Sequence, residues 1–319
     1  MDMTTTLVDH TFRKDVRRCF EMQTYAIPAR WLYDRRGSEL FEEITELPEY
    51  YPTRTETALL KANGAAFAAS TGSGRAVIEF GSGSSAKTPH LLKAIDPAAY
   101  VPIDISGAFL EHSASLLQDE FPKLPIYPVE ADFMKRVALP DAVADMPKLG
   151  FFPGSTIGNM IARTSVDLLR FMRETLGEGA QLLIGIDRIK DPQILVDAYD
   201  DSAGVTAQFS LNLLHRINRE LDGDIPVELF RHRAEWNDLY ARIEIFLEAQ
   251  QDLRFSIDGQ GYELGKGQKL HIENSHKYGL RDARLMLRAG GWTPLHEWSD
   301  ERDYFTLMLV EAHPYKHAP

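Results

Sequence analysis

The chain has 319 residues, of which 44% are hydrophobic and 26% charged, a composition typical of a globular protein with one large domain or two of ordinary size. Its formal net charge of −12 argues against a nucleic acid as the main partner, because phosphate binding requires a basic face. The single cysteine, Cys19, excludes an internal disulfide framework and fits a reducing cytoplasm. We find no stretch long enough for a membrane span and no apolar secretion signal at the N-terminus. We therefore expect a cytoplasmic monomer that acts on a small molecule and holds no metal.

The first fifty residues mix charged and aromatic side chains. From residue 8 to residue 49 the pattern predicts short helices with breaks at Pro28 and Gly37. One helix is expected over Phe12–Gln23, where Cys19 would be a packed thiol rather than a nucleophile.

The next segment, LPEYYPTRTETALL at residues 47–60, contains two adjacent tyrosines between prolines. Thr53 and Glu56 have the spacing of a capping box, which predicts a helix start at this point. Tyr50 and Tyr51 are stiff, aromatic and polar-tipped, as a ligand wall requires. Their rings could equally pack a seam between domains.

A strand is expected over Ala76–Phe80, and it leads into the glycine-rich string GSGSSA and a helix over Lys87–Ile95. Glycines let a nucleotide approach the backbone, and a helix amino terminus offers free N–H groups. The string lacks the third glycine of the dinucleotide pattern. Glu79 just before this short turn looks more like an S-adenosylmethionine site. A tight turn without a ligand is the alternative.

Two further strands are expected over Tyr100–Ile103 and Ile126–Glu130. Asp104 follows the first of them, 21 residues after Gly83, about where such folds place an acid on the ribose hydroxyls. It could also cap the next helix, and the two roles are compatible. Past the other strand, Asp132-Phe133 could contact an adenine, or could be a cap followed by a core residue.

A fourth strand over Leu149–Phe152 leads into the loop PGSTIGN, and a fifth is expected over Gln181–Ile186. Because parallel strands present their carboxyl ends at one edge of the sheet, this loop should emerge beside the glycine-rich turn.

After Arg188 the pattern changes. Residues 191–221 look helical, and three short segments rich in strand formers follow, at 236–247, 253–257 and 270–275. The end of the chain predicts a helix over 282–289 and two antiparallel strands that close the sheet. The fold class is therefore α/β: a seven-stranded, Rossmann-like class I methyltransferase domain with a second α+β domain. We assign residues 56–189 and 281–319 to the S-adenosylmethionine domain, and 1–55 and 190–280 to a substrate-binding cap.

Five strings carry a resemblance to a known family, and together they cover nearly the whole chain from about residue 25. They are WLYDRRGSELFEEITELPEYYPTRTE, IEFGSGSSAKT, FFPGSTIGN, AYDDSAGVTAQF and HIENSHKY. The chain resembles the histidine-specific methyltransferases of the ergothioneine pathway. This resemblance implies trimethylation of the α-amino group of L-histidine to hercynine by three molecules of S-adenosyl-L-methionine.

The resemblance implies a set of residues that bind the methyl donor. Asp104 would bind the ribose, and Asp132 and Phe133 would lie beside the adenine. The other donor-side positions are Glu79, Gly81, Ser82, Gly83, Lys87 and Gly154.

It also implies residues that recognise the imidazole. Tyr50 would face the ring, and Glu273 and Ser275 of IENS would hold its edge. The family has an apolar residue where this chain has Asn274, which should point away from the ligand as alternate strand residues do. A further apolar substrate-binding residue is expected at Leu239. On local sequence alone, Glu273 would instead form a strand-edge salt bridge with Lys277 or Arg281.

The remaining implied positions surround the reacting amine. Asn159 and Tyr199 would hold the carboxylate and backbone of the substrate, and Tyr33 and Phe41 would line the space around its amine. We expect Tyr33, Phe41 and Asn159 to be the catalytic residues. Two alternatives remain: a methyltransferase for another amino acid such as tryptophan, or a non-catalytic protein that binds S-adenosylmethionine.

Overall fold

The computed structural model describes residues 9–313, and the chain divides into two compact units. Unit 1 comprises the residues up to Tyr51 together with Asp191–Ser275, and unit 2 comprises Pro52–Lys190 and the residues from His276 onward. The expected absence of a secretion signal concerns residues 1–8, which lie outside the described part. No helix within residues 9–313 has both the length and the apolar character needed to cross a bilayer.

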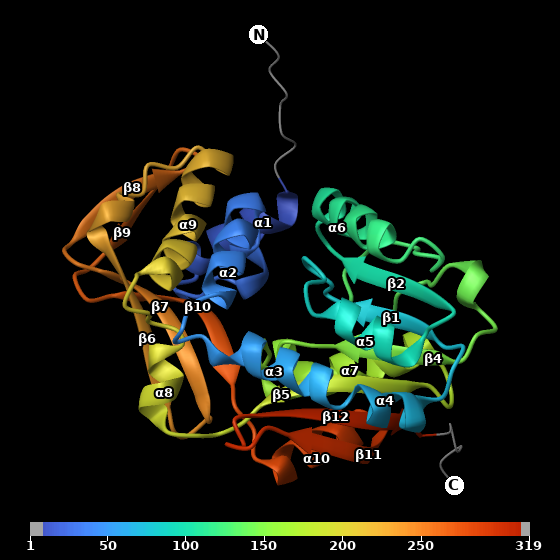
Figure 1. The fold of residues 1–319 in the computed structure, drawn as a ribbon. Coiled ribbons are helices and arrows are strands. Elements are labelled where there is room, and N and C mark those ends of the chain that lie inside the picture. The colour runs from blue at the N-terminus through green and yellow to red at the C-terminus, as the bar shows by residue number, and fades with distance from the viewer. Residues whose placement is uncertain (1–8, 314–319) are drawn as a thin grey trace, which may run out of the picture. The chain divides into compact units, whose positions relative to one another are not determined.

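Unit 2 is built on a seven-stranded sheet in the order β11-β12-β5-β4-β1-β2-β3 (Figure 1). Its strands are β1 (Ala76–Phe80), β2 (Ala99–Asp104), β3 (Val129–Glu130), β4 (Lys148–Phe152), β5 (Gln181–Asp187), β11 (Trp292–Ser299) and β12 (Phe305–Ala312). The first five pair in parallel, whereas β12 runs antiparallel to both β5 and β11. The predicted seven strands with a final antiparallel hairpin are confirmed.

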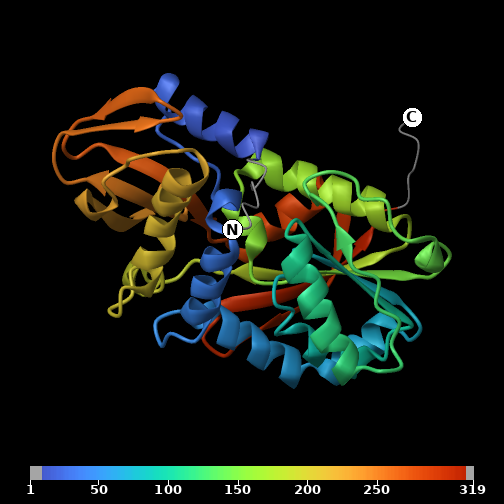
Figure 2. The same cartoon turned by 90° about the horizontal axis from the view of Figure 1, so that it is seen from above.

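Helices cover both faces of this sheet, as Figure 2 shows from above. One face packs against α3 (Tyr51–Ala62), α4 (Gly64–Thr71), α5 (Thr88–Ile95) and α6 (Gly107–Glu120). The other packs against α7 (Ala162–Leu176) and α10 (Leu280–Ala289). The short 3-10 helices η2 (Asp141–Val143) and η3 (Thr156–Asn159) follow β3 and β4. Because both faces are covered, every residue of β1 and β5 is buried, as in most parallel sheets.

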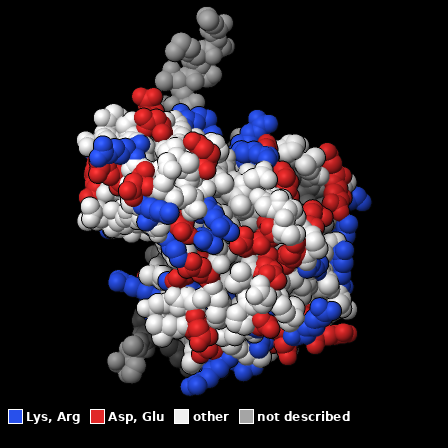
Figure 3. All heavy atoms as spheres, turned by 90° about the vertical axis from the view of Figure 1, so that its left-hand side faces the viewer, with Lys and Arg blue, Asp and Glu red and all other residues white. Residues whose placement is uncertain are grey.

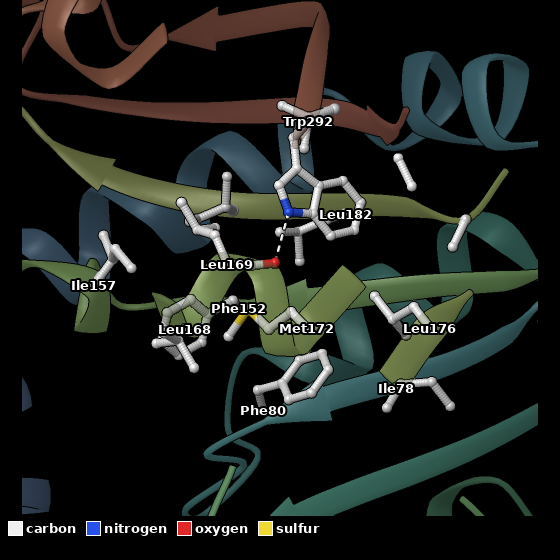
Figure 4. Packing of buried hydrophobic residues seen from close by; sticks show 14 of the residues in the cluster. Ile78, Phe80, Phe152, Ile157, Leu168, Leu169, Met172, Leu176, Leu182 and Trp292 are labelled. Carbon is white, nitrogen blue, oxygen red and sulfur yellow. Dashed lines mark hydrogen bonds between the residues drawn. The ribbon is translucent and has the colours of Figure 1, made fainter. Parts of the chain in front are cut away.

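The core on the α7 side shows how the carboxyl-terminal hairpin is anchored (Figure 4). Trp292 is fully buried, and its Nε1 donates a hydrogen bond to the carbonyl oxygen of Leu169 at 2.9 Å. A Cβ at Gly290 would lie 2.4 Å from the Cβ of Leu169. The glycine turn before β11 therefore allows the end of α10 and α7 to pack closely.

Unit 1 combines two small antiparallel sheets with helices. Its strands are β6 (Phe230–Asn237), β7 (Arg242–Ala249), β8 (Leu253–Ile257), β9 (Gln260–Leu264) and β10 (Lys269–His276), in sheets β10-β7-β6 and β8-β9. Its helices are α1 (His10–Glu21), η1 (Ala29–Leu32), α2 (Arg35–Thr45), α8 (Pro192–Asp197), α9 (Val205–Glu220) and η4 (Val227–Leu229). Buried and half-buried residues alternate along β7, as expected for a sheet with one covered face.

Cys19 is fully buried in α1, as predicted for a packed thiol. Burial raises the pKa of this thiol to about 12, so it carries no thiolate at neutral pH.

Three predictions about local structure were wrong, each because a turn was misread. Residues 236–247 are not one segment, because β6 and β7 are separated by a turn after Asn237. The helical region at 191–221 is divided between α8 and α9 by an intervening turn that contains Tyr199. The predicted strand over Ile126–Glu130 pairs continuously only at Val129–Glu130, with a single bridge from Ile126 to Tyr100.

Two predictions at helix starts were also wrong. Gly37 lies inside α2 rather than at a break, since Asp34 caps this helix by accepting a hydrogen bond from the Gly37 N–H at 2.8 Å. α3 already begins at Tyr51, and Glu56 bonds to groups outside that helix rather than forming a capping box with Thr53.

Acidic and basic side chains are interspersed on the face of the molecule drawn in Figure 3. Many of them pair, as Arg254 does with Glu263 at 2.9 Å. Exposed pairs of this kind contribute about 0–1 kcal/mol each. A face with interspersed charges is not the basic surface that a nucleic acid backbone requires.

Candidate active site

The glycine-rich turn after β1 is held close to the end of β2. The N–H groups of Gly81 and Ser82 both donate to the carbonyl oxygen of Ile103, at 2.8 and 3.1 Å. Gly81 and Gly83 have φ angles of +72° and +51°, in the region that favours glycine. A Cβ at Gly81 would lie 3.1 Å from the ring of Phe133, whereas one at Gly83 would meet nothing within 4 Å. The turn is therefore packed on one side and open above Gly83.

Asp104 ends β2 and supports this turn. Its Oδ2 accepts a hydrogen bond from the Gly83 N–H, and its Oδ1 accepts one from the Ser106 N–H, both at 3.0 Å. Each carboxylate oxygen has a second lone pair for another donor. The side chain therefore orders two backbone segments and keeps the capacity to accept from a diol.

Glu79 lies beneath the turn. It is 1% exposed, and its Oε2 accepts hydrogen bonds from the hydroxyls of Thr88 at 2.7 Å and Tyr100 at 2.5 Å. Burial raises the pKa of Glu79 to about 7, although both hydroxyl bonds lower it. In this position the carboxyl group joins β1, β2 and the start of α5, and it supports the turn from below.

A buried carboxylate that sequence reasoning missed lies at the same edge of the sheet. Glu56 of α3 is 0% exposed and accepts a hydrogen bond from Lys87 Nζ at 2.5 Å. Its Oε2 also accepts from the Gly154 N–H at 2.9 Å. The expected donor-side residues Lys87 and Gly154 are thus brought together on one side chain. The only sequence signal at Glu56 was its spacing from Thr53, which suggested a cap.

The residues at this edge fit S-adenosylmethionine. Ser82 Oγ is buried and, within residues 9–313, has no hydrogen-bond partner, so it is available to a ligand. The Lys87 ammonium can pair with a carboxylate, and Asp104 suits a ribose diol. Asp132 accepts a hydrogen bond from the Met134 N–H at 3.0 Å, and the Phe133 ring packs 5.9 Å from that of Phe152. Both are half-buried, so the local cap and core contacts leave part of each side chain accessible.

The loop after β4 reaches the same edge. Ser155 accepts a hydrogen bond from the Asp187 N–H at 2.9 Å, and the Gly158 carbonyl oxygen accepts one from His276 Nδ1 at 2.7 Å. A Cβ at Gly158 would lie 2.7 Å from the His276 carbonyl oxygen, so only glycine fits. Asn159 ends η3 immediately after this packed glycine.

In unit 1, five aromatic rings form a continuous cluster. Tyr33 lies 5.6 Å from Phe41 and 5.4 Å from Phe209, measured between ring centroids. Phe41 lies 6.2 Å from Tyr50, which in turn lies 5.9 Å from Tyr199. Most of these pairs are edge-to-face, the arrangement that aromatic quadrupoles favour. Four of the five were expected in the site, and Phe209 of α9 was missed.

Polar groups border this aromatic cluster. The hydroxyls of Tyr199 and Ser275 lie 2.7 Å apart, and Glu273 is 7% exposed. Burial raises the pKa of Tyr33 well above its usual value, and the negative charge of Glu273, followed by Tyr50 and Tyr199, raises it further. Glu273 is therefore near enough to Tyr33 to interact electrostatically.

Asn274 lies between Glu273 and Ser275 in β10, and its side chain contacts a histidine of the same strand. Its Oδ1 lies 3.0 Å from His271 Nε2, which therefore acts as the donor. The expectation that Asn274 points away from the ligand stays a prediction. Lys277, one of the partners considered for Glu273, instead pairs with Asp187 at 2.6 Å.

Polar side chains outside the cluster hold in place the segments that carry its rings. Asp34 accepts hydrogen bonds from Asn212 at 2.7 Å and Arg219 at 2.6 Å, which ties the start of α2 to α9. Buried His232 has Nε2 2.8 Å from the Tyr199 carbonyl oxygen and Nδ1 3.0 Å from Ser210 Oγ. These contacts fix the segments that carry Tyr33, Phe41 and Tyr199.

Leu239 does not fit its expected role. It lies in the turn between β6 and β7 and is 82% exposed. Leu239 was chosen from the family resemblance as the apolar residue that follows Glu235-Trp236, and the turn after Asn237 lies at this point of the chain. A side chain so exposed does not line the aromatic cluster.

Comparison with known proteins places the chain in one family. The model of the family described as histidine-specific, S-adenosylmethionine-dependent methyltransferase matches residues 12–312. A histidine N-alpha-methyltransferase of Mycolicibacterium smegmatis is 36% identical over 93% of this chain and 94% of its own. One of Mycobacterium tuberculosis is 37% identical over the same shares. Ergothioneine biosynthesis protein 1 of Neurospora crassa is 29% identical over 90% of this chain, which spans 33% of that protein.

The family match spans both units and contains all the strings on which the resemblance was based. Two relatives exceed 35% identity over more than nine-tenths of the chain. The chain therefore belongs to the histidine-specific, S-adenosylmethionine-dependent methyltransferases.

Proposed function

We propose that the protein methylates the α-amino group of L-histidine three times, using S-adenosyl-L-methionine, to form hercynine in ergothioneine biosynthesis. The observation that carries this proposal is the grouping of a buried carboxylate, two hydroxyls and five aromatic rings in unit 1 of a chain from this family. A carboxylate and hydroxyls match the two nitrogens of an imidazole, and the rings match a methylated ammonium.

The donor-binding residues are proposed to lie at the carboxyl edge of the unit 2 sheet. Bound there, S-adenosylmethionine supplies a methyl group already activated by its sulfonium. Lys87 binds its carboxylate, Asp104 its ribose, and Ser82 Oγ a polar atom nearby. Glu79, Gly81, Gly83 and Gly154 shape the backbone around it. Asp132 and Phe133 contact the adenine.

Histidine selectivity follows from the chemistry of the polar border. Glu273 accepts the N–H of the imidazole, and Ser275, oriented by its contact with Tyr199 at 2.7 Å, serves the other nitrogen. An apolar side chain in this place would leave the buried carboxylate of Glu273 without that partner. Tyr50 stacks beside the imidazole. Selection against an apolar amino acid therefore comes from a polar group left unpaired.

Methyl transfer to nitrogen requires a neutral amine, whereas an α-ammonium group is largely protonated at neutral pH. Tyr33 keeps its own proton because its pKa is raised, so it serves as a hydrogen-bond donor or acceptor rather than as a phenolate base. The ammonium proton leaves through water or a polar neighbour other than a Tyr33 phenolate. Tyr33 and Phe41 stabilise the methylated cation through their ring faces, and Asn159 and Tyr199 hold the carboxylate and backbone. Positioning supplies most of the rate acceleration.

A mass-spectrometric assay tests this function. Purified protein is incubated with S-adenosylmethionine and each proteinogenic amino acid separately. We expect histidine alone to gain three methyl groups. Methylation of tryptophan but not histidine would establish the nearest alternative, and binding of S-adenosylmethionine without any turnover would establish a non-catalytic role.

We further propose that the protein acts as a monomer in the cytoplasm. The reduced, buried state of its single cysteine supports this proposal. Light scattering of the purified protein across a concentration series tests the oligomeric state, and a mass that rises with concentration would contradict it.

A further inference from the structure

Glu56 is a buried carboxylate whose contacts all lie at the donor-side edge of the unit 2 sheet. Its side chain comes from α3, and its oxygens meet groups that follow β1 and β4. Lys87 Nζ lies 2.5 Å from Oε2, and the Gly154 N–H donates to Oε2 at 2.9 Å with a longer contact to Oε1 at 3.1 Å. One side chain therefore joins two loops that are 67 residues apart in the sequence.

The surrounding backbone is adapted to this carboxylate. A Cβ at Gly185 of β5 would lie 2.3 Å from Glu56 Oε1, so the strand must have glycine at this point. Gly154 has a φ angle of +78°, and a Cβ there would lie 3.5 Å from Lys87 Nζ. Gly185 thus makes room for the carboxylate, and Gly154, in the loop after β4, supplies the positive φ angle that this loop requires.

Burying this carboxylate is costly unless it is paired and hydrogen-bonded. Glu56 comes from the same helix as Leu59 and Leu60, which pack in the apolar core on the α3 face of the sheet. The Lys87 side chain remains 17% exposed while Glu56 is 0% exposed, so the ammonium lies at the outer side of the pair. An ammonium has three donors, and Glu56 accepts from one of them.

We propose that Glu56 is a positioning residue for the methyl donor: it fixes Lys87 and the Gly154 loop in the conformation that binds the carboxylate end of S-adenosylmethionine. The inference rests on the proposed function, because it assigns Lys87 to that ligand. Glu56 itself does not touch the ligand. It restricts a flexible lysine to one rotamer, so less side-chain entropy is lost when the ligand binds.

Isothermal titration of S-adenosylmethionine into the full-length protein tests the proposal. We expect Glu56→Gln to raise the Kd at least about ten-fold, the effect of weakening one charge-assisted hydrogen bond. With saturating donor, the KM for histidine should stay within about two-fold of wild type, as expected when the substituted residue acts independently of the histidine-binding residues. Thr57→Ala, which removes only a bond from Thr57 Oγ1 to the Thr53 carbonyl oxygen in the same helix, is the matched control and should leave the Kd unchanged.

The decisive comparison adds Lys87→Met. If Glu56 acts through Lys87, the Glu56→Gln/Lys87→Met double variant should bind the donor no more than about two-fold more weakly than Lys87→Met alone. The double variant also removes both charges together, which avoids leaving the fully buried Glu56 carboxylate without its cation.

Three outcomes overturn the inference. They are an unchanged Kd in Glu56→Gln, fully additive losses in the double variant, or an equal loss of donor affinity in Thr57→Ala. Failure of the wild-type protein to bind S-adenosylmethionine is a different result, which contradicts the proposed function itself. A third result is also distinguishable. If the wild type binds the donor and Lys87→Met weakens this binding but Glu56→Gln does not, the proposed function stands and the role of Glu56 is contradicted.

Discussion

The donor-side edge of unit 2 and the aromatic cluster of unit 1 are built in different ways. At the edge of the sheet, backbone groups define the site: the N–H groups of Gly81, Ser82 and Gly83 donate hydrogen bonds to the end of β2. In the cluster, side chains define the site, and they come from positions as distant as Tyr33 and Ser275. Under the proposed function, backbone groups of a turn recognise the methyl donor, and particular rings and a carboxylate recognise the amino acid.

This difference predicts that substitutions in the two regions have different effects. Changes in the cluster should alter which amine is accepted and the KM for it, because the recognising atoms belong to single side chains. Changes at the sheet edge should alter donor affinity or stability and leave amino acid selectivity intact. The predictions that follow test this division, beginning with the largest effect.

Glu273→Ala should reduce kcat/KM for histidine by about 100-fold, because an imidazole N–H then lacks its charged acceptor. Donor affinity should not change. Steady-state kinetics with histidine and titration of S-adenosylmethionine measure the two effects separately. Glu263→Ala, at an exposed acid of β9 that pairs with Arg254, is the control and should retain wild-type kinetics. A wild-type KM for histidine in Glu273→Ala would show that the carboxylate does not bind the imidazole.

Gly37→Ala should destabilise the protein by about 3 kcal/mol, because its Cβ would lie 1.8 Å from the Leu32 carbonyl oxygen. Gly83→Ala should cost only about 1 kcal/mol, since the new methyl group meets nothing and the φ angle of +51° is the only strain. Urea denaturation gives both free energies of unfolding. Equal losses in the two variants would contradict the view that the Leu32 backbone leaves no room for a side chain at Gly37, whereas Gly83 is constrained only by its backbone conformation.

The sequence predicted the strand, turn and helix at this edge well because their signals are local. An apolar run, glycines and an acid lie within a dozen residues, and parallel topology then places the loop after β4 beside them. β1 and the helix after it lie where they were expected, with differences of one residue at the boundaries. Asp104 illustrates the limit, since a sequence cannot distinguish a cap from a ribose ligand, and its bonds to Gly83 and Ser106 leave both roles possible.

The cluster could not be assembled from local pattern, and only the family resemblance identified its members. Phe209 was missed because a buried phenylalanine in a helix has the same sequence signal whether it packs a core or lines a site. Glu56 was missed because its partners, Lys87 and Gly154, are distant along the chain, and its spacing from Thr53 suggested a local role. Leu239 was chosen by matching the family pattern after Glu235-Trp236, and that match does not mark the turn between β6 and β7 in which Leu239 lies.

Glu79→Gln should remove a pH dependence of stability. The folded protein holds the Glu79 proton up to about pH 7, whereas the unfolded chain releases it near its ordinary value of 4.5. Between these values the folded state binds more protons, so stability falls as pH rises and levels off above about 7. The loss is at most about 3 kcal/mol, since one pKa unit corresponds to about 1.4 kcal/mol.

Glutamine is neutral throughout this range and keeps an oxygen that accepts from Thr88 and Tyr100. Urea denaturation across the window should therefore show a difference between variant and wild type that grows with pH. Amino acid selectivity should stay unchanged, as expected for a group beneath the turn. A constant difference would mean that Glu79 already carries its charge when folded.

The smallest expected effect is that of Leu239→Ser. With 82% of its surface exposed in the turn between β6 and β7, Leu239 loses almost no buried area on substitution, so stability should change by less than about 0.5 kcal/mol. The KM for histidine should also match wild type, whereas Phe209→Ala, which removes a ring 5.4 Å from that of Tyr33, should raise it. If Leu239→Ser raised the KM while Phe209→Ala did not, the substrate would be bound by the hairpin turn, and the cluster would be an ordinary part of the unit 1 core.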